Sequence, residues 1–463
     1  MSTSSLGPGR TLAQQLAGFA AGTSWAGLPQ RVQQRARLHA LDTLGLALAS
    51  HSQDFAAPAL AGIAAAGAPG QASVIGDRRR LAPRDAACAN GLLMHGLDYD
   101  DTHLASIVHP SVVGLPAALA LGEVLDRPWT EVLAAYAVGV EAAIRIGLAV
   151  KGGFHHAGFH ATGVVAHFGA ALVAGRLLGL DAEGLTAAQG IAASTAAGVQ
   201  VFLEEGAWSK RLHPGWGALA GITAAHLAQA GFKAPTRPYE GRFGLFESHL
   251  HGEAATLGAI GDGLGRHWHL PDTAIKPYPV CHFIHGCLDA ALALHGQCEP
   301  AQIERVTAWL APDTLPIVAE PAEAKRRASS DYEAKFSAHH CVAAMLLRGR
   351  FGLPELGAEA LADPATRALA LRVDCRADPE TRFPEYFSGG VTVQLRDGRR
   401  LHQHVPVNKG AGARALEAAD IEAKFLANAG MRLEPAQARR VRDAVLTDEP
   451  VSTRMLMAWL SGA

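Results

Sequence analysis

The segment HGLDYDDTHLASIVHPS, residues 95–111, concentrates side chains that transfer protons. It holds three aspartates and three histidines, although only 18% of the chain is charged. His95, Asp98 and Thr102 are three and four residues apart, a spacing that puts them on one face if the segment is helical. His109 precedes a proline, which favours an extended backbone there. The composition allows a metal site, an acid–base site or a polar loop, and His109, beside a turn, is the candidate for a functional role.

A second polar cluster, KGGFHHAGFHATG at residues 151–163, interrupts the apolar helical patterns around it. His160 stands just before a helix that is expected to start near Thr162. The positive end of a helix disfavours an imidazolium, so His160 should be neutral and able to accept a proton. The position predicts an acid–base role for His160.

Two further clusters place cations and imidazoles where helices are expected to begin. The stretch WSKRLHPGWG contains Lys210 and His213, and KPYPVCHFIHGCLDAAL contains Lys276, His282 and His285. A lysine beside the unpaired N–H groups of a helix start favours a bound carboxylate or phosphate. The pattern predicts a small polyanionic substrate, held by lysine and helix ends and acted on by histidine.

The same residue types permit other interpretations. Clustered aspartates and histidines can ligate a metal, and His156 and His160 have the spacing of ligands on a helix. However, glycines disfavour a helix there and no HExxH motif occurs, so a site without metal is expected. No GxSxG motif supports a serine nucleophile. Several other residues are expected to be structural, namely His167, His226, His295, His402, Cys281 and Cys287.

Composition narrows the class of protein. The 463 residues are 49% apolar, enough for a sizeable core, and 41 basic against 43 acidic residues give a net charge of -2. This balance gives no electrostatic reason to bind nucleic acid or an anionic membrane. Neither a run of about 18 apolar residues nor a charged leader before an apolar run occurs, so no transmembrane helix or secretory signal is expected. Six cysteines without a CxxC pair predict a reduced, cytoplasmic protein.

Hydrophobic periodicity divides the chain into two kinds of structure. Up to about residue 265 the pattern predicts helix after helix, rich in the Ala and Gly that allow close packing. Alternation then predicts strands at residues 303–311 and 368–376, and a hairpin that turns at Asp397 and Gly398. Helical periodicity returns near the C-terminus. The expected fold is mainly α with α+β: a large helical domain of residues 1–268, completed by 408–463, and a smaller inserted α+β domain of residues 269–407.

Four stretches together resemble the MmgE/PrpD family. They are HGLDYDDTH…HPS, GFHATGVVAHFGAA, SKRLHPGWGA and KPYPVCHFIHGCLDAAL, supported in the family's order by YEGRFGLFES, EAKFSAHHCVAAML and IEAKF. The resemblance implies a homodimer whose α+β domain is a lid, an active site between the two domains, and no metal or organic cofactor. It carries the site over to Asp98, Thr102, His109, His160, Lys210 and His285. His340 stands where the family often has an active-site tyrosine.

The resemblance also implies chemistry beside a carboxylate, as in 2-methylcitrate dehydratase, cis-aconitate decarboxylase and iminodisuccinate epimerase. Fixed cations would stabilise a carbanion there, and histidines would move protons. The first expectation is a cofactor-free hydro-lyase for a small di- or tricarboxylate. Decarboxylase or epimerase chemistry is the alternative, and a non-catalytic carboxylate-binding protein is the different class. The expected catalytic residues are His109, His160, Asp98, which orients His109 or acts as a base, and His285; the expected substrate-binding residues are Lys210, Thr102, His213 and His340.

Overall fold

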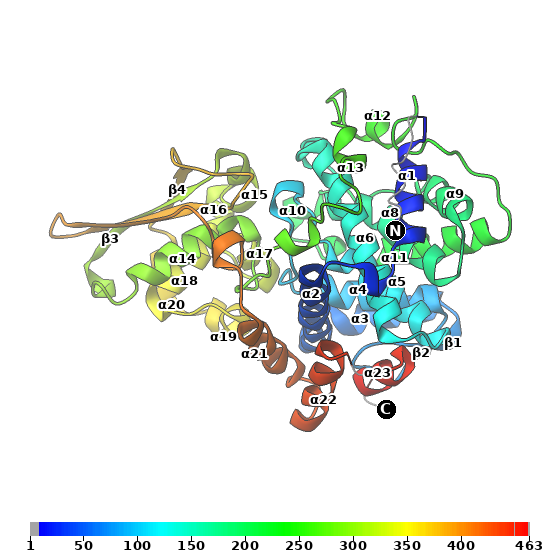
Figure 1. Cartoon of the computed structure of the whole chain (residues 1–463). Coiled ribbons are helices and arrows are strands. Elements are labelled where there is room, and N and C mark those ends of the chain that lie inside the picture. Colours follow the sequence, from blue (N-terminus) through cyan, green and yellow to red (C-terminus); the bar gives the residue numbers. More distant parts are fainter. Residues whose placement is uncertain (1–8, 449, 462–463) are drawn as a thin grey trace.

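The chain folds into two lobes (Figure 1). The computed structural model describes residues 9–448 and 450–461, so the first eight residues of the expected helical domain lie outside it. One lobe consists of helices from the N-terminal half, drawn blue to green, together with the red C-terminal helices. The other lobe, drawn light green to orange, combines helices with a four-stranded sheet. The expected fold class, mainly α with α+β, is confirmed.

The helical lobe is built on long helices that bury Ala, Gly, Leu and Val. Its larger helices are α1 (Leu12–Gly22), α2 (Gln30–Ala49), α3 (Ala56–Ala66), α4 (Pro83–His95), α5 (Ser111–Val124), α6 (Trp129–Val150), α8 (Ala161–Leu177), α9 (Ala182–Ala192) and α11 (Ser209–Gln229). Short elements join them: β1 (Pro69–Ser73), β2 (Arg80–Leu81), α7 (Gly153–His156), α10 (Phe202–Glu205), α12 (Leu245–His249) and α13 (Gly258–Gly261).

Glycines set the helix spacing that brings the polar clusters together. A Cβ on Gly221 of α11 would lie 2.6 Å from Cβ of Ala170 in α8, and one on Gly91 of α4 would lie 2.7 Å from Cα of Gly215. Larger side chains at these positions would force the helices apart. The start of α11, with Lys210, is thereby held close to both α4 and α8.

One helix, α6, is long and apolar enough to cross a membrane by length and composition. In the structure 94% of its most apolar window is buried inside the protein. It is therefore placed as a core helix of the helical lobe. The cytoplasmic location stays a prediction.

The C-terminal part of the chain returns to the helical lobe. Its helices are α21 (Ala418–Ala429), α22 (Pro435–Leu446) and α23 (Thr453–Leu460). Phe425, Val441 and Leu456 belong to the same buried apolar cluster as residues of α2 and α5. The helical lobe is thus completed by the chain that follows the inserted lobe.

The inserted lobe is organised around the sheet β4-β3-β5-β6. β3 (Ile303–Leu310) pairs in parallel with β4 (Val373–Ala377) and antiparallel with β5 (Gly389–Leu395), which continues to β6 (Arg400–Val405). The hairpin predicted at Asp397 and Gly398 is confirmed. The helices of this lobe are α14 (His285–Leu294), α15 (Leu315–Val318), α16 (Ala322–Arg326), α17 (Asp331–Lys335), α18 (Ala338–Arg348), α19 (Ala358–Leu361) and α20 (Pro364–Ala370).

The structure differs from the sequence-based expectation at three places. α4 ends at His95, and Asp98 has a left-handed backbone (φ 51°), so His95, Asp98 and Thr102 do not share a helical face. Helix α11 begins at Ser209, so Lys210 lies inside its first turn rather than ahead of it. The strand expected over residues 368–376 is shorter and begins only at Val373. Helix α20, which starts at the N-cap Asp363, occupies the chain as far as Ala370.

Candidate active site

A small cavity lies where the two lobes meet. Its volume is about 50 Å³, room for only a few water molecules at roughly 10–15 Å³ each. From the helical lobe it is lined by Asp98, Thr102, Ile107, His109, His155, His160, Gln200, Phe202, Leu203 and Lys210. From the inserted lobe it is lined by Lys276, Cys281, His282, Phe283, Ile317, Phe336 and Phe387.

Two ammonium groups converge on one carboxylate at this cavity. Lys210 Nζ donates to Asp98 Oδ1 at 2.7 Å, and Lys276 Nζ donates to the same oxygen at 3.2 Å and to the Asp98 carbonyl at 2.7 Å. Burial by itself would raise the pKa of Asp98, but the two lysines lower it well below its usual value. The cavity therefore has a net positive wall, suited to a substrate carboxylate.

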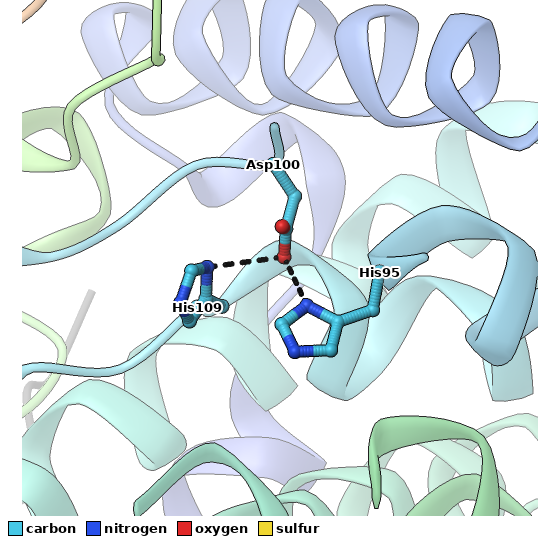
Figure 2. A group of neighbouring side chains, drawn as sticks. All are labelled: His95, Asp100 and His109. Atoms are coloured by element: carbon cyan, nitrogen blue, oxygen red, sulfur yellow. Dashed lines mark hydrogen bonds and ion pairs between the residues drawn. The ribbon is translucent and has the colours of Figure 1, made fainter. Parts of the chain in front are cut away.

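A second carboxylate, Asp100, lies between two imidazoles (Figure 2). His95 Nδ1 lies 2.8 Å and His109 Nδ1 lies 3.2 Å from Asp100 Oδ2, and both Asp100 and His95 are buried. His109 Nε2 lies 3.9 Å from Asp98 Oδ1, beyond hydrogen-bond distance. Asp100 rather than Asp98 is thus the carboxylate in contact with His109.

Neutral imidazoles continue the cluster at the start of α8. The rings of His95 and His160 stack with centroids 5.5 Å apart, and His160 Nδ1 lies 3.1 Å from His213 Nδ1. Burial lowers the pKa of His160 well below its usual value, with a further contribution from the charge of Lys210. Burial likewise lowers the pKa of His155 to about 3 and that of His213 to about 4. The rings of His155, His160 and His213 are therefore neutral near pH 7.

The loop that carries the aspartates is fixed at several points. Asp101 accepts from the backbone N–H and the hydroxyl of Ser111, and it lies 2.6 Å from His39 Nδ1. The backbone N–H of His109 donates to the hydroxyl of Thr162 at the start of α8. Rigid supports of this kind hold reactive side chains in one geometry.

The inserted lobe contributes an imidazole with a defined tautomer. Asn408 Oδ1 accepts from the backbone N–H of Phe387, so its amide nitrogen faces His282 Nε2 at 2.9 Å. An amide donor at Nε2 leaves the proton of a neutral His282 on Nδ1. His285 stands behind His282, with ring centroids 4.4 Å apart, and its Nε2 lies 3.3 Å from the Val280 carbonyl.

The grouping of His95, Asp100 and His109 also has the composition of a metal site. One ligand atom from each lies within 4.8 Å of the others, and the same holds for His267, His269 and Asp272 at the surface. In the first group both imidazole nitrogens already face one carboxylate oxygen. The hydrogen bond from His95 Nδ1 suits N–H donation to a carboxylate. The metal-free site remains a prediction.

Comparison with known proteins shows the family of this chain. Residues 14–257 match the MmgE/PrpD N-terminal domain, and residues 278–449 match the MmgE/PrpD C-terminal domain. The chain belongs to the MmgE/PrpD family. The first match ends at residue 257 and the second begins at residue 278, close to the point where the chain leaves the helical lobe.

Several relatives of this MmgE/PrpD protein are named cis-aconitate decarboxylase or cis-aconitate decarboxylase-like protein. The cis-aconitate decarboxylase-like protein oryM of Aspergillus oryzae is 26% identical over 458 residues, 94% of either chain. The cis-aconitate decarboxylase of Homo sapiens is 29% identical over 366 residues, 76% of this chain and 74% of its own. That of Aspergillus terreus is 32% identical over 240 residues, 50% of this chain and 49% of its own. The chain is accordingly an enzyme of the MmgE/PrpD family.

The structure brings together most of the residues singled out from the sequence. Those that line the cavity are Asp98, Thr102, His109, His160 and Lys210. His213 and His285 lie one layer behind, against His160 and His282. His340 does not line the cavity: it is buried in α18, with its ring 6.5 Å from that of Phe351.

Other residues at the cavity were not selected from the sequence. Lys276 and His282 were noted at a helix start but given no role, although both line the cavity. Asp100 was one of three aspartates with no feature to distinguish it from Asp98 and Asp101. The contacts of the three aspartates depend on the direction in which each side chain points from an irregular loop. Hydrophobic periodicity does not encode this direction.

Proposed function

We propose that this protein is a cofactor-independent lyase that removes CO₂ from a small unsaturated tricarboxylate of the cis-aconitate type. The observation that carries the proposal is the convergence of Lys210, Lys276 and neutral imidazoles on one cavity between the lobes. The names of the relatives favour decarboxylation over the dehydration that was expected first. The homodimer expected from the family stays a prediction.

The lysines would bind the carboxylates of the substrate. Two ammonium groups and a buried Thr102 hydroxyl, which has no hydrogen-bond partner among the described residues, face the same space. Charge-assisted hydrogen bonds contribute about 1.5–3 kcal/mol each. A substrate with several carboxylates would therefore gain more than a monocarboxylate, which supports a di- or tricarboxylate as the substrate class.

The reaction would then need one proton. The bond between a carboxylate carbon and its neighbour breaks, CO₂ leaves, and the electron pair stays on the substrate as a carbanion stabilised by the fixed cations. A protonated imidazole delivers one proton to that carbanion and becomes neutral, and solvent restores its proton. His109 and His160 both line the cavity and are the candidates for this transfer.

Dehydration of a hydroxytricarboxylate such as 2-methylcitrate is the second candidate, because it uses the same groups. An imidazole would abstract the proton beside a carboxylate, and a protonated group would accompany the leaving hydroxide. Epimerisation would return the proton on the opposite face. These reactions differ in their products, so one assay separates them.

The test is product analysis by NMR in D₂O. Purified protein is incubated in turn with cis-aconitate, 2-methylcitrate, citrate and an iminodisuccinate analogue. We expect CO₂ release from cis-aconitate with one deuterium on the product carbon. Loss of water from 2-methylcitrate would replace decarboxylation with dehydration, and no turnover or deuterium incorporation with any of them would refute a lyase of this class.

Three variants connect the activity with the site. His160→Gln should lower kcat by about 100-fold or more if the ring transfers a proton. Lys210→Met should raise KM by about tenfold or more, because it removes a charge-assisted hydrogen bond. Lys233→Met is the matched control, since Lys233 is exposed and does not line the cavity. An equal loss of activity in Lys233→Met would mean that the purified samples differ in quality, and that the effect does not come from the site.

A further inference from the structure

We propose that Asp100 is a positioning residue that keeps the proton of His109 on Nδ1 and leaves Nε2 to exchange protons with the substrate. His95 shares the same carboxylate and limits the charge that Asp100 presents to His109. The role in turnover rests on the proposed function, whereas the proton position is a property of the protein without substrate.

The geometry of Figure 2 is the basis of this assignment. Asp100 is fully buried, and His95 Nδ1 is hydrogen-bonded to its Oδ2 at 2.8 Å. His109 Nδ1 lies 3.2 Å from the same oxygen, at ion-pair distance but without the alignment of a hydrogen bond. A carboxylate contact at Nδ1 favours the tautomer with the proton on that nitrogen. The other nitrogen of His109, Nε2, is the one on the side of Asp98, which itself lines the cavity.

No other imidazole at the cavity has such a contact within the described part of the chain. His160 Nδ1 meets His213 Nδ1 at 3.1 Å, and either ring can be the donor. His155 makes no ion pair among residues 9–448 and 450–461, and His282 faces the amide of Asn408. Asp100 therefore singles out His109 among the cavity histidines as the ring that an anion supports when it carries a positive charge.

Charged groups from every neighbouring element act on His109. Asp100 and Asp98 belong to its own loop, Lys210 to α11, and Lys276 to the segment that enters the inserted lobe; the rings of His95 and His160 lie beside it. Burial lowers the pKa of His109 to about 4, and Asp100 opposes part of this fall while the two lysines add to it. A bound polyanion between the lysines and His109 would oppose it further.

This arrangement fits a complete proton cycle. Nε2 of the His109 imidazolium gives its proton to the carbanion left by CO₂, and the N–H electron pair stays on nitrogen. The neutral ring keeps its Nδ1 proton toward Asp100, so Nε2 has a lone pair aimed at the cavity. A solvent proton then restores the imidazolium, which the Asp100 carboxylate stabilises.

The first test needs no substrate. Protein labelled with ¹⁵N-histidine is studied by NMR at neutral pH, and His109→Gln identifies the signals of His109. We expect one tautomer, protonated on Nδ1 and unprotonated on Nε2. A proton on Nε2, or signals averaged between the two nitrogens, would overturn the inference even in an active enzyme. Failure of every tricarboxylate to react would overturn the proposed function and leave this result standing.

The second test uses two variants with opposite expected effects. Asp100→Asn removes the anion, so the basic limb of the kcat profile should move to lower pH by about one unit or more, and kcat at pH 7 should fall about tenfold or more. KM should change by less than about threefold. His95→Phe frees the carboxylate for His109 alone, so the same limb should move to higher pH.

The control is another histidine–aspartate pair, in which the carboxylate is buried and the imidazole is partly exposed. His404 Nε2 lies 2.9 Å from Asp378 Oδ2 in the inserted lobe, and neither residue lines the cavity. Asp378→Asn should leave the pH profile and the His109 signals unchanged. If both Asp100→Asn and His95→Phe lower kcat without moving the limb, Asp100 is merely structural and the inference is wrong. If Asp100→Asn does not fold, the tautomer in the unaltered protein and the His95→Phe profile still decide.

Discussion

Asp98 is the residue on which the charges of the site converge. Its carboxylate stays ionised, because Lys210 and Lys276 lower its pKa well below the usual value against the effect of burial. A carboxylate held in this state is a weak base. Its left-handed backbone, at φ 51°, turns the side chain toward both lysines. Asp98 is thus better suited to keeping two cations side by side than to abstracting a proton.

The histidines at the cavity and directly behind it are mostly neutral by themselves, so they supply few protons. Burial keeps the pKa of His109 and His213 at about 4 and that of His155 at about 3. At pH 7 nearly all of these rings are neutral in the empty site. A polyanionic substrate would raise their pKa values, so that proton uptake accompanies binding. The acid would then be available mainly when there is a carbanion to protonate.

His340 gives a test of a residue expected to bind substrate. It is buried in α18 and lies outside the cavity lining, so His340→Gln should change kcat and KM by less than about threefold. The lost packing should lower the free energy of unfolding by about 0.5–3 kcal/mol. Steady-state kinetics and denaturant unfolding measure the two effects. A tenfold rise in KM with unchanged stability would show that His340 does bind substrate.

Elements were predictable from sequence where periodicity was strong. The helices α6 and α8 and the hairpin of β5 and β6 follow from apolar repeats and from a two-residue turn signal. The roles in the loop between α4 and α5 were not, since three aspartates within four residues differ only in the direction that the backbone gives them. The site was predictable as a set of polar helix starts. Its division between Asp98, Asp100 and Asp101 required the coordinates.

One element after the inserted lobe fixes two segments that enter the site. Lys424 of α21 donates to the carbonyls of Tyr99 and Lys276, at 3.0 Å each, and lies 2.8 Å from Asp42 Oδ1 in α2. The two segments also pair with each other, through Thr102 and Ala274. The IEAKF stretch near the C-terminus therefore acts on the site through the backbone, without lining the cavity.

Lys424→Met should destabilise the protein, and more so at high pH. Removing one partner of a buried ion pair costs about 3–5 kcal/mol. Burial already raises the pKa of Asp42 to about 6, and Lys424 limits this rise, so the variant should have a higher value still. A raised carboxyl pKa means that the folded state resists ionisation, so stability is lost as pH increases through that range. Urea unfolding should show a larger deficit at pH 8 than at pH 5.

The double variant Asp42→Asn with Lys424→Met separates the effect of the unpaired charge from the effect of the changed side-chain shape. It leaves no unpaired charge in the core, so most of the pH dependence of the deficit should disappear. A deficit of equal size at both pH values in the single variant would contradict the ionisation of Asp42 as its cause.

At the scale of the whole molecule, the cavity lies between the lobes and takes its walls from both. A space of about 50 Å³ is too small to admit a tricarboxylate from solvent without movement. The lobes are joined beside the cavity by Arg211 of α11, whose guanidinium donates to Asp331 of α17 at 3.0 Å and lies 4.8 Å from the ring centre of Tyr332. Opening the site would have to break this contact.

Asp331→Ala should therefore favour the open arrangement. Loss of a charge-assisted hydrogen bond of about 1.4 kcal/mol or more would make opening about tenfold more frequent. Hydrogen exchange followed by mass spectrometry should show faster exchange in the cavity segments 200–203 and 281–284, and a saturated tricarboxylate should slow it again. Asp374→Asn is the control, because Asp374 pairs with Arg305 and Arg326 within the inserted lobe. Unchanged exchange in Asp331→Ala would mean that the lobes separate elsewhere or that substrate enters without their separation.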